Sequence, residues 1–209
     1  MSSILPLFPL NLVVFPGEEL NLHIFEPRYK ELVNDCISKK VNFGIPSYVN
    51  KKLELGTEME IKSVEKLYDD GKMDIITLGL RVFKVLNYQN PKPGKLHADG
   101  EVEFYSDDLA GDESLSMKLI DLVNTLYDLL KVNVNYTLEN YHNSFFLAHK
   151  IGLSRLQEYE LLKLNSEDKR QQFIIYHLKS SISTMREMEK TKQIIKMNGH
   201  FKHFDPIKF

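Results

Sequence analysis

Three short stretches near the start of this chain carry its most distinctive pattern: residues 5–10 read LPLFPL, residues 14–17 read VFPG and residues 22–29 read LHIFEPRY. The four prolines in these stretches fix φ and remove backbone hydrogen-bond donors, so they divide the region into short extended pieces. Gly17 permits a turn directly after Pro16. Leu20, Leu22 and Ile24 then recur at every second position, which predicts a strand with at least one apolar face.

Glu26, Pro27 and Arg28 occupy the junction between this strand and a predicted helix over residues 28–39. Proline suits the first helical turn because its missing N–H group would be unpaired there anyway. A carboxylate just before a helix can cap the free N–H groups and is favoured by the helix dipole. Arg28 could pair with a carboxylate from another strand. We therefore expect these three residues to be structural and to hold the junction together.

The hydrophobic period changes from two to 3.6 near residue 108. Strands are predicted at residues 43–49, 56–64, 73–86 and 101–105. The alternation breaks at Val64, which predicts a β-bulge, and Asp70-Gly71 predicts a hairpin turn. Beyond a polar boundary at residues 107–114, helices are predicted around residues 119–130, at 138–150, after a Ser154 cap, and from Asn165 or Ser166 to about Met197, with Gly199 ending the last one. The chain is thus of the α+β class, with a β domain over residues 1–108 and a helical domain over residues 109–209.

Taken together, the opening stretches resemble the signature of the Lon protease N-terminal, or substrate-binding, domain family. Residues 43–45 (FGI), 55–57 (LGT) and 79–85 (GLRVFKV) are also similar to the family pattern. The resemblance implies a PUA-like β pseudo-barrel followed by a C-terminal α-helical bundle with one long terminal helix. It also implies a stand-alone member of the family that recognises unfolded or exposed protein segments.

The implied function is that of a non-catalytic peptide-binding module, an adaptor or chaperone-like factor that could act beside a protease or another protein partner. Such a module would bury apolar peptide side chains on an exposed hydrophobic surface between the two halves. We select Phe15, Pro16, Phe25 and Tyr29 as the candidate peptide-binding residues.

Motifs for catalysis are missing from the sequence. It contains neither the G-x-x-x-x-G-K-[ST] phosphate loop nor a G-x-S-x-G nucleophile elbow, so we predict no enzymatic activity. ATP-dependent peptidase activity is an alternative that only the family resemblance suggests. We predict no cofactor and no metal site, because His200 and His203 have no completing ligands nearby. The single cysteine, Cys36, is expected to pack against the core from its helix.

Charge and hydropathy give further expectations about partners. The formal net charge of −2 provides no global attraction to nucleic acid or to an anionic membrane. RNA binding is kept as an alternative, because PUA-like folds occur in RNA-binding proteins, although Glu187 and Glu189 interrupt the basic C-terminal stretch. No secretory signal or bilayer-spanning apolar run is visible, and one cysteine suits a reducing compartment, so we expect a cytoplasmic protein without membrane partners. The oligomeric state is left open.

Overall fold

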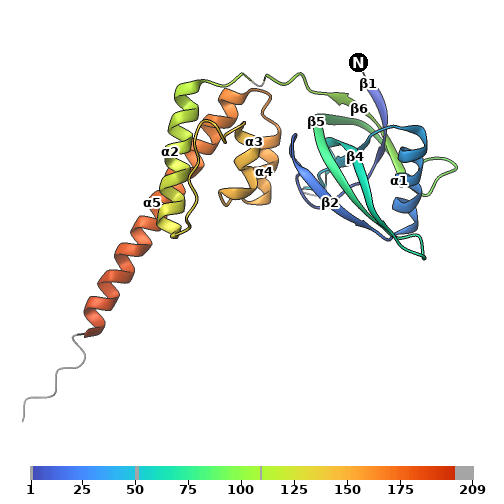
Figure 1. Cartoon of the computed structure of the whole chain (residues 1–209). Helices are drawn as coiled ribbons and strands as arrows, with labels where there is room; N and C mark the ends of the chain where they lie inside the picture. The colour runs from blue at the N-terminus through green and yellow to red at the C-terminus, as the bar shows by residue number, and fades with distance from the viewer. Residues whose placement is uncertain (1, 50–51, 109, 201–209) are drawn as a thin grey trace, which may run out of the picture.

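The computed structural model describes residues 2–49, 52–108 and 110–200, with side chains to residue 197 (Figure 1). The strands are β1 (Ser2–Leu7), β2 (Glu19–Ile24), β3 (Phe43–Pro46), β4 (Leu55–Leu67), β5 (Met73–Gln89) and β6 (Ala98–Phe104). The helices are α1 (Pro27–Lys39), α2 (Glu113–Leu130), α3 (Ser144–Leu147), the 3-10 turn η1 (Ala148–Lys150), α4 (Arg155–Leu162) and α5 (Glu167–His200). The strands precede the main helices in the chain, as the change of hydrophobic period predicts, and Figure 1 shows them as two halves joined by an extended segment.

The strands form one sheet in the order β2-β5-β4-β3-β1-β6. The long strand β5 also pairs with β6, from Phe83 opposite Phe104 to Gln89 opposite Asp99. This second pairing closes β5, β4, β3, β1 and β6 into a ring of paired strands. Strand β2 lies outside that ring, where it pairs with the first part of β5.

Local signals in the β half predicted its details well. The pairing of β4 with β5 shifts register on both sides of Val64, which confirms the predicted bulge. Tyr68 N donates to Lys72 O at 2.9 Å, and Gly71 has φ +75°, so the predicted Asp70-Gly71 turn is also confirmed. Helix α1 buries Leu32, Val33 and Cys36 against the sheet, which confirms the expected packing of Cys36 against the core.

The helix predicted over residues 138–150 is wrong. The chain instead forms a turn at residues 138–140, and a short helix begins only at Ser144. Asn140 accepts a hydrogen bond from Thr137 N at 2.8 Å, and Asn143 accepts one from Phe146 N at 3.1 Å. Such short polar side chains compete with the helical backbone for its own hydrogen bonds, so they break the segment and restart it.

The long helix α5 packs against α2, and its first half contributes Ile174, Leu178 and Ile182 to the core. It continues to His200, beyond the stop predicted at Gly199. Its opening turn contains Arg170, which is fully buried. The Arg170 guanidinium contacts Glu167 Oε2 at 2.8 Å and Asp107 Oδ1 at 2.7 Å, which ties the end of the β half to the start of α5.

One apolar cluster spans both halves of the chain. It joins Val13, Phe15, Val49, Leu55 and Val82 of the β half to residues of every helix from α2 to α5. The two halves are therefore packed against each other through shared apolar side chains, and the segment that carries the VFPG stretch lies at their contact.

Candidate functional site

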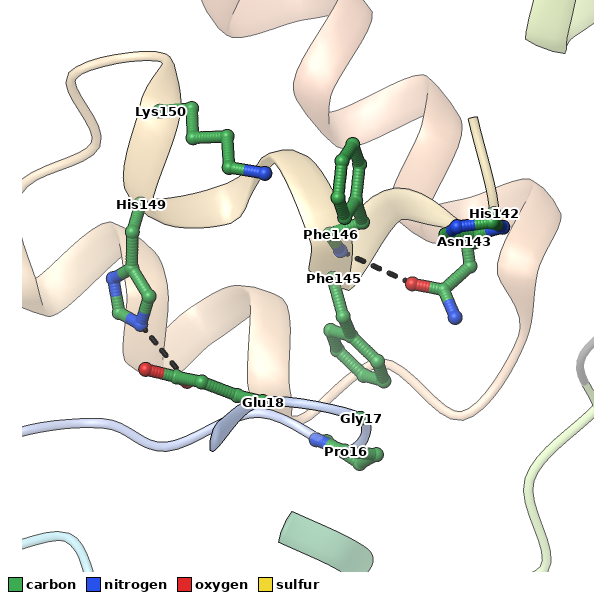
Figure 2. Close-up of a pocket in the computed structure, with 9 residues that line it drawn as sticks. All are labelled: Pro16, Gly17, Glu18, His142, Asn143, Phe145, Phe146, His149 and Lys150. Carbon is green, nitrogen blue, oxygen red and sulfur yellow. Dashed lines mark hydrogen bonds and ion pairs between the residues drawn. The ribbon is translucent and has the colours of Figure 1, made fainter. Parts of the chain in front are cut away.

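A pocket of about 480 Å³ opens where the two halves meet (Figure 2). The β half contributes the turn before β2, and the helical half contributes α3, η1 and the residues that precede them. The lining residues are Pro16, Gly17, Glu18, His142, Asn143, Phe145, Phe146, His149 and Lys150. We call this cavity the inter-half pocket.

Two aromatic rings, Phe145 and Phe146, line the inter-half pocket. Phe15 is 1% exposed, and its ring stacks on Phe145 with centroids 5.1 Å apart. The Arg170 guanidinium lies 4.4 Å from the centre of the Phe145 ring. Phe146 is only partly buried, and Lys150 Nζ lies over its ring at 3.3 Å from the ring centre. Burial lowers the pKa of Lys150. The pocket thus offers apolar rings beside a cationic amine.

His149 bridges the two halves at the edge of the pocket. Its Nε2 lies 3.1 Å from Glu18 Oε2, and its Nδ1 lies 2.8 Å from Glu158 Oε1 on α4. The hydrogen bond to Glu18 and the nearby carboxylate of Glu158 outweigh burial and raise the pKa of His149 to about 9. The imidazolium is therefore the dominant form at neutral pH, and it joins carboxylates that are far apart in sequence.

A glycine-containing bulge presents the β side of the pocket. Gly17 has φ +83°, a conformation that favours glycine, and its N–H donates to Gly79 O at 2.9 Å. Gly79 N in turn donates to Glu18 O at 2.8 Å. This two-against-one arrangement is a G1 bulge. It turns Glu18 toward His149 (Figure 2), and Glu18 also accepts from Phe15 N at 2.8 Å.

The four predicted peptide-binding residues lie in different surroundings. Pro16 lines the inter-half pocket, and Phe15 lies buried beneath it. Phe25 is 56% exposed just after β2, and Tyr29 is buried against Phe8 with ring centroids 3.7 Å apart. The structure therefore brings Phe15 and Pro16 together and leaves Phe25 and Tyr29 elsewhere. Their role in peptide binding stays a prediction.

The junction residues differ from expectation in their contacts. Glu26 occupies the N-cap position of α1, but its side chain makes no capping hydrogen bond. Arg28 pairs with it locally, with Nε at 2.9 Å and Nη2 at 2.8 Å from Glu26 Oε2. The expected cap and the expected pairing of Arg28 with another strand are both wrong, because the two side chains neutralise each other across Pro27. Arg28 also lies over the ring of Tyr29 at 4.5 Å.

A second cavity of about 460 Å³ lies beside this junction. Its lining includes Arg28, Tyr29, Tyr48 and Tyr88. Burial raises the pKa of both Tyr29 and Tyr88. The arginine here is already neutralised by Glu26, so this cavity offers less unpaired charge than the inter-half pocket.

Most of the helical lining was missed from the sequence. The interpretation of residues 138–150 as one continuous helix hid the Asn143 cap that orients Phe146. The useful signal was Asn143-Ser144 directly before two phenylalanines, which is a helix start within the supposed helix.

The described part of the chain shows neither a metal-binding cluster nor a membrane-spanning helix. No group of three or more His, Cys, Asp or Glu side chains there is placed to hold a metal ion. No helix within residues 2–49, 52–108 and 110–200 is both long enough and apolar enough to cross a membrane.

Comparison with known proteins gives one family and a consistent fold. The model of the ATP-dependent protease La (LON) substrate-binding domain matches residues 4–180. A Lon N-terminal domain protein from Xanthomonas campestris is 26% identical, with a TM-score of 0.63 over 83% of this chain and 98% of that chain. The N-terminal domain of a Mycobacterium avium complex Lon protease has the same TM-score of 0.63 over 85% of this chain and 98% of its own. At 12% identity the latter bears on the fold alone.

Proposed function

Because this chain belongs to the ATP-dependent protease La (LON) substrate-binding domain family, we propose that it binds unfolded or exposed segments of other proteins, and that the inter-half pocket is where it holds their apolar side chains. The observation that carries the proposal is the pocket itself, about 480 Å³ in volume, with Phe145 and Phe146 in its lining. Concave sites with apolar walls and a few oriented polar groups are the usual form of binding sites.

The polar groups of the pocket suit a peptide. Lys150 offers N–H donors beside the aromatic wall, and they can approach peptide carbonyl or carboxylate oxygens. Glu18 offers an acceptor from the opposite side. Aromatic side chains supply much of the energy at protein interfaces, so Phe146, the partly exposed ring, is the residue we expect to contribute most.

Fluorescence anisotropy with labelled, reduced and carboxymethylated α-lactalbumin tests the proposal. We expect saturable binding in the micromolar range by the wild-type chain. Phe146→Ala should weaken it about tenfold, because truncation of an interface aromatic commonly costs 1–2 kcal/mol or more. Tyr176→Ala is the matched control, since Tyr176 is 79% exposed on α5 and outside the pocket. Equal affinity of the wild type, Phe146→Ala and Tyr176→Ala would show that the pocket does not bind the probe. No saturable binding by the wild type would contradict the proposed function.

We also propose that this binding is not coupled to catalysis within the chain. The pocket lining contains no serine, threonine or cysteine that could act as a nucleophile. The imidazole of His149 is held between two carboxylates and protonated, so it is a poor general base at neutral pH. An adaptor or chaperone-like role agrees with both features. Cleavage of casein by the pure chain with ATP would contradict this part of the proposal.

The ring of strand pairings also supports the finer expectation of a PUA-like β pseudo-barrel. Five strands close on one another through the pairing of β5 with β6. A closed ring leaves few free strand edges. Strand β2 lies outside this ring and is paired only with β5 among the described strands.

A further inference from the structure

Strand β2 has one free edge. It pairs with β5 along residues 19–24, and no other strand pairs with it among the residues that the structure describes. Free strand edges carry unpaired N–H and C=O groups, and an added extended chain is the natural partner of such groups.

The hydrogen-bond pattern shows which backbone groups face outward. The G1 bulge makes Glu18 and Gly79 a hydrogen-bonded pair, and such pairs recur at every second position of an antiparallel ladder. Leu20, which also accepts from Thr77 Oγ1 at 2.8 Å, therefore directs its backbone groups toward β5. By the same alternation, the backbone N–H and C=O groups of Glu19, Asn21 and His23 point to the free edge. The side chains of these three residues are exposed.

The free edge connects two apolar features. At its start the Glu18 contact with His149 places β2 beside the inter-half pocket, and Figure 1 shows β2 on the side of the sheet that faces the helical half. Directly after its end, Phe25 is 56% exposed and stacks against His23 with ring centroids 6.0 Å apart. A strand of this length spans roughly 20 Å, at about 3.4 Å per residue. One extended segment can therefore reach both features.

We propose that an extended segment of an unfolded polypeptide adds to the free edge of β2 as a further strand. This inference rests on the proposed function and specifies how that function is performed. Main-chain hydrogen bonds to Glu19, Asn21 and His23 hold the segment without regard to its sequence. Its side chains reach the inter-half pocket at one end and Phe25 at the other, which favours segments with apolar residues near both ends.

A single extended chain fits this edge better than a second copy of the protein does. An added strand needs only the spacing of about 4.8 Å between neighbouring strands. A second copy would need room for a whole folded β half beside this edge, where α3 and η1 already contact the β half through Phe145 and His149.

The experiment combines two variants with amide exchange, using labelled, reduced and carboxymethylated α-lactalbumin as the probe. Asn21→Pro removes an outward N–H while keeping the ladder to β5, and Asn21→Thr is the control that keeps this N–H. We expect Asn21→Pro to weaken binding about tenfold and Asn21→Thr to change it less than about twofold. Hydrogen exchange followed by NMR should show the amides of Glu19, Asn21 and His23 becoming protected when the probe binds.

The outcomes separate this inference from the proposed function. If the wild type binds the probe and neither Asn21→Pro nor the three amides respond, edge pairing is wrong while the proposed function stands. If the wild type does not bind, both fail. If Asn21→Pro does not fold, the amide exchange of the wild type decides alone. Concentration-dependent protection of the same amides without probe would identify a second copy as the occupant and overturn the inference.

Discussion

Replacing Phe15 with alanine tests whether the VFPG stretch acts as a connection between the halves. The Phe15 ring is 1% exposed and belongs to the apolar cluster shared by the two halves. It stacks on Phe145 at 5.1 Å and lies 5.0 Å from the His149 ring. Truncation of a buried phenylalanine costs about 3–5 kcal/mol, and the lost aromatic pair places this site toward the upper part of that range. We expect the free energy of unfolding to fall by about 4 kcal/mol.

Urea unfolding followed by far-UV circular dichroism measures this loss, because the chain has no tryptophan to report by fluorescence. Phe25→Ala is the matched control, since the same change at a side chain that is 56% exposed should cost less than about 0.5 kcal/mol. A loss below about 1 kcal/mol for Phe15→Ala, or equal losses in the two variants, would refute the role of the Phe15 ring in the core shared by the two halves.

Four further predictions concern single residues. The pKa of His149 is raised from 6.5 to about 9, so its contribution to stability is complete below about pH 6.5 and is lost as pH rises through about 9. His149→Gln should abolish this part of the pH profile of urea stability, a contribution of about 1 kcal/mol after allowance for solvent screening. An unchanged pH profile would contradict this prediction. Arg170→Met leaves the buried carboxylate of Glu167 without its 2.8 Å partner, so calorimetry should show a loss of about 3–5 kcal/mol, and a loss under about 1 would show that the pair is dispensable. Burial raises the pKa of the Cys36 thiol to about 12, so a disulfide-exchange reagent should react with it only in urea, and rapid reaction of the folded chain would place the thiol at the surface. A Cβ at Gly79 would clash with Phe15 O, so Gly79→Ala should cost about 1–3 kcal/mol by thermal unfolding, and an unchanged melting temperature would argue against the close approach of β5 to the segment that carries Phe15.

The β half could be predicted in detail because its signals are local. The alternation break at Val64 and the Asp70-Gly71 turn each depend on neighbouring residues alone, and both features are present. The closure of the sheet could not be predicted in this way. It depends on the pairing of Phe83 with Phe104 and of its neighbours, which only the folded chain brings together.

The helical half shows where local signals mislead. Residues 138–150 carry enough apolar side chains to suggest a helix, but Asn140 and Asn143 bind nearby backbone groups instead. A distant group also contributes, because Glu167 accepts from Ser144 N at 2.7 Å. A buried carboxylate from another helix thus helps to fix where α3 begins, and no local pattern reports it.

The candidate site could be predicted only in part for the same reason. Phe15 and Pro16 were selected from the opening stretches, and Pro16 does line the pocket. The opposite wall, with Phe146 and His149, lies some 130 positions further along the chain and meets Glu18 only through tertiary packing. Glu26 and Arg28 were correctly placed at a junction, but their partners were wrong because the two side chains satisfy each other.

Selective NMR labelling of the aromatic rings tests the central claim most directly. The ring resonances of Phe146 and Tyr176 would be followed while reduced and carboxymethylated α-lactalbumin is added to the wild-type chain. We predict a saturable shift at Phe146, in the inter-half pocket, and no shift at Tyr176 on the exposed face of α5. Saturable binding that leaves the Phe146 ring unchanged would contradict the assignment of peptide binding to this pocket.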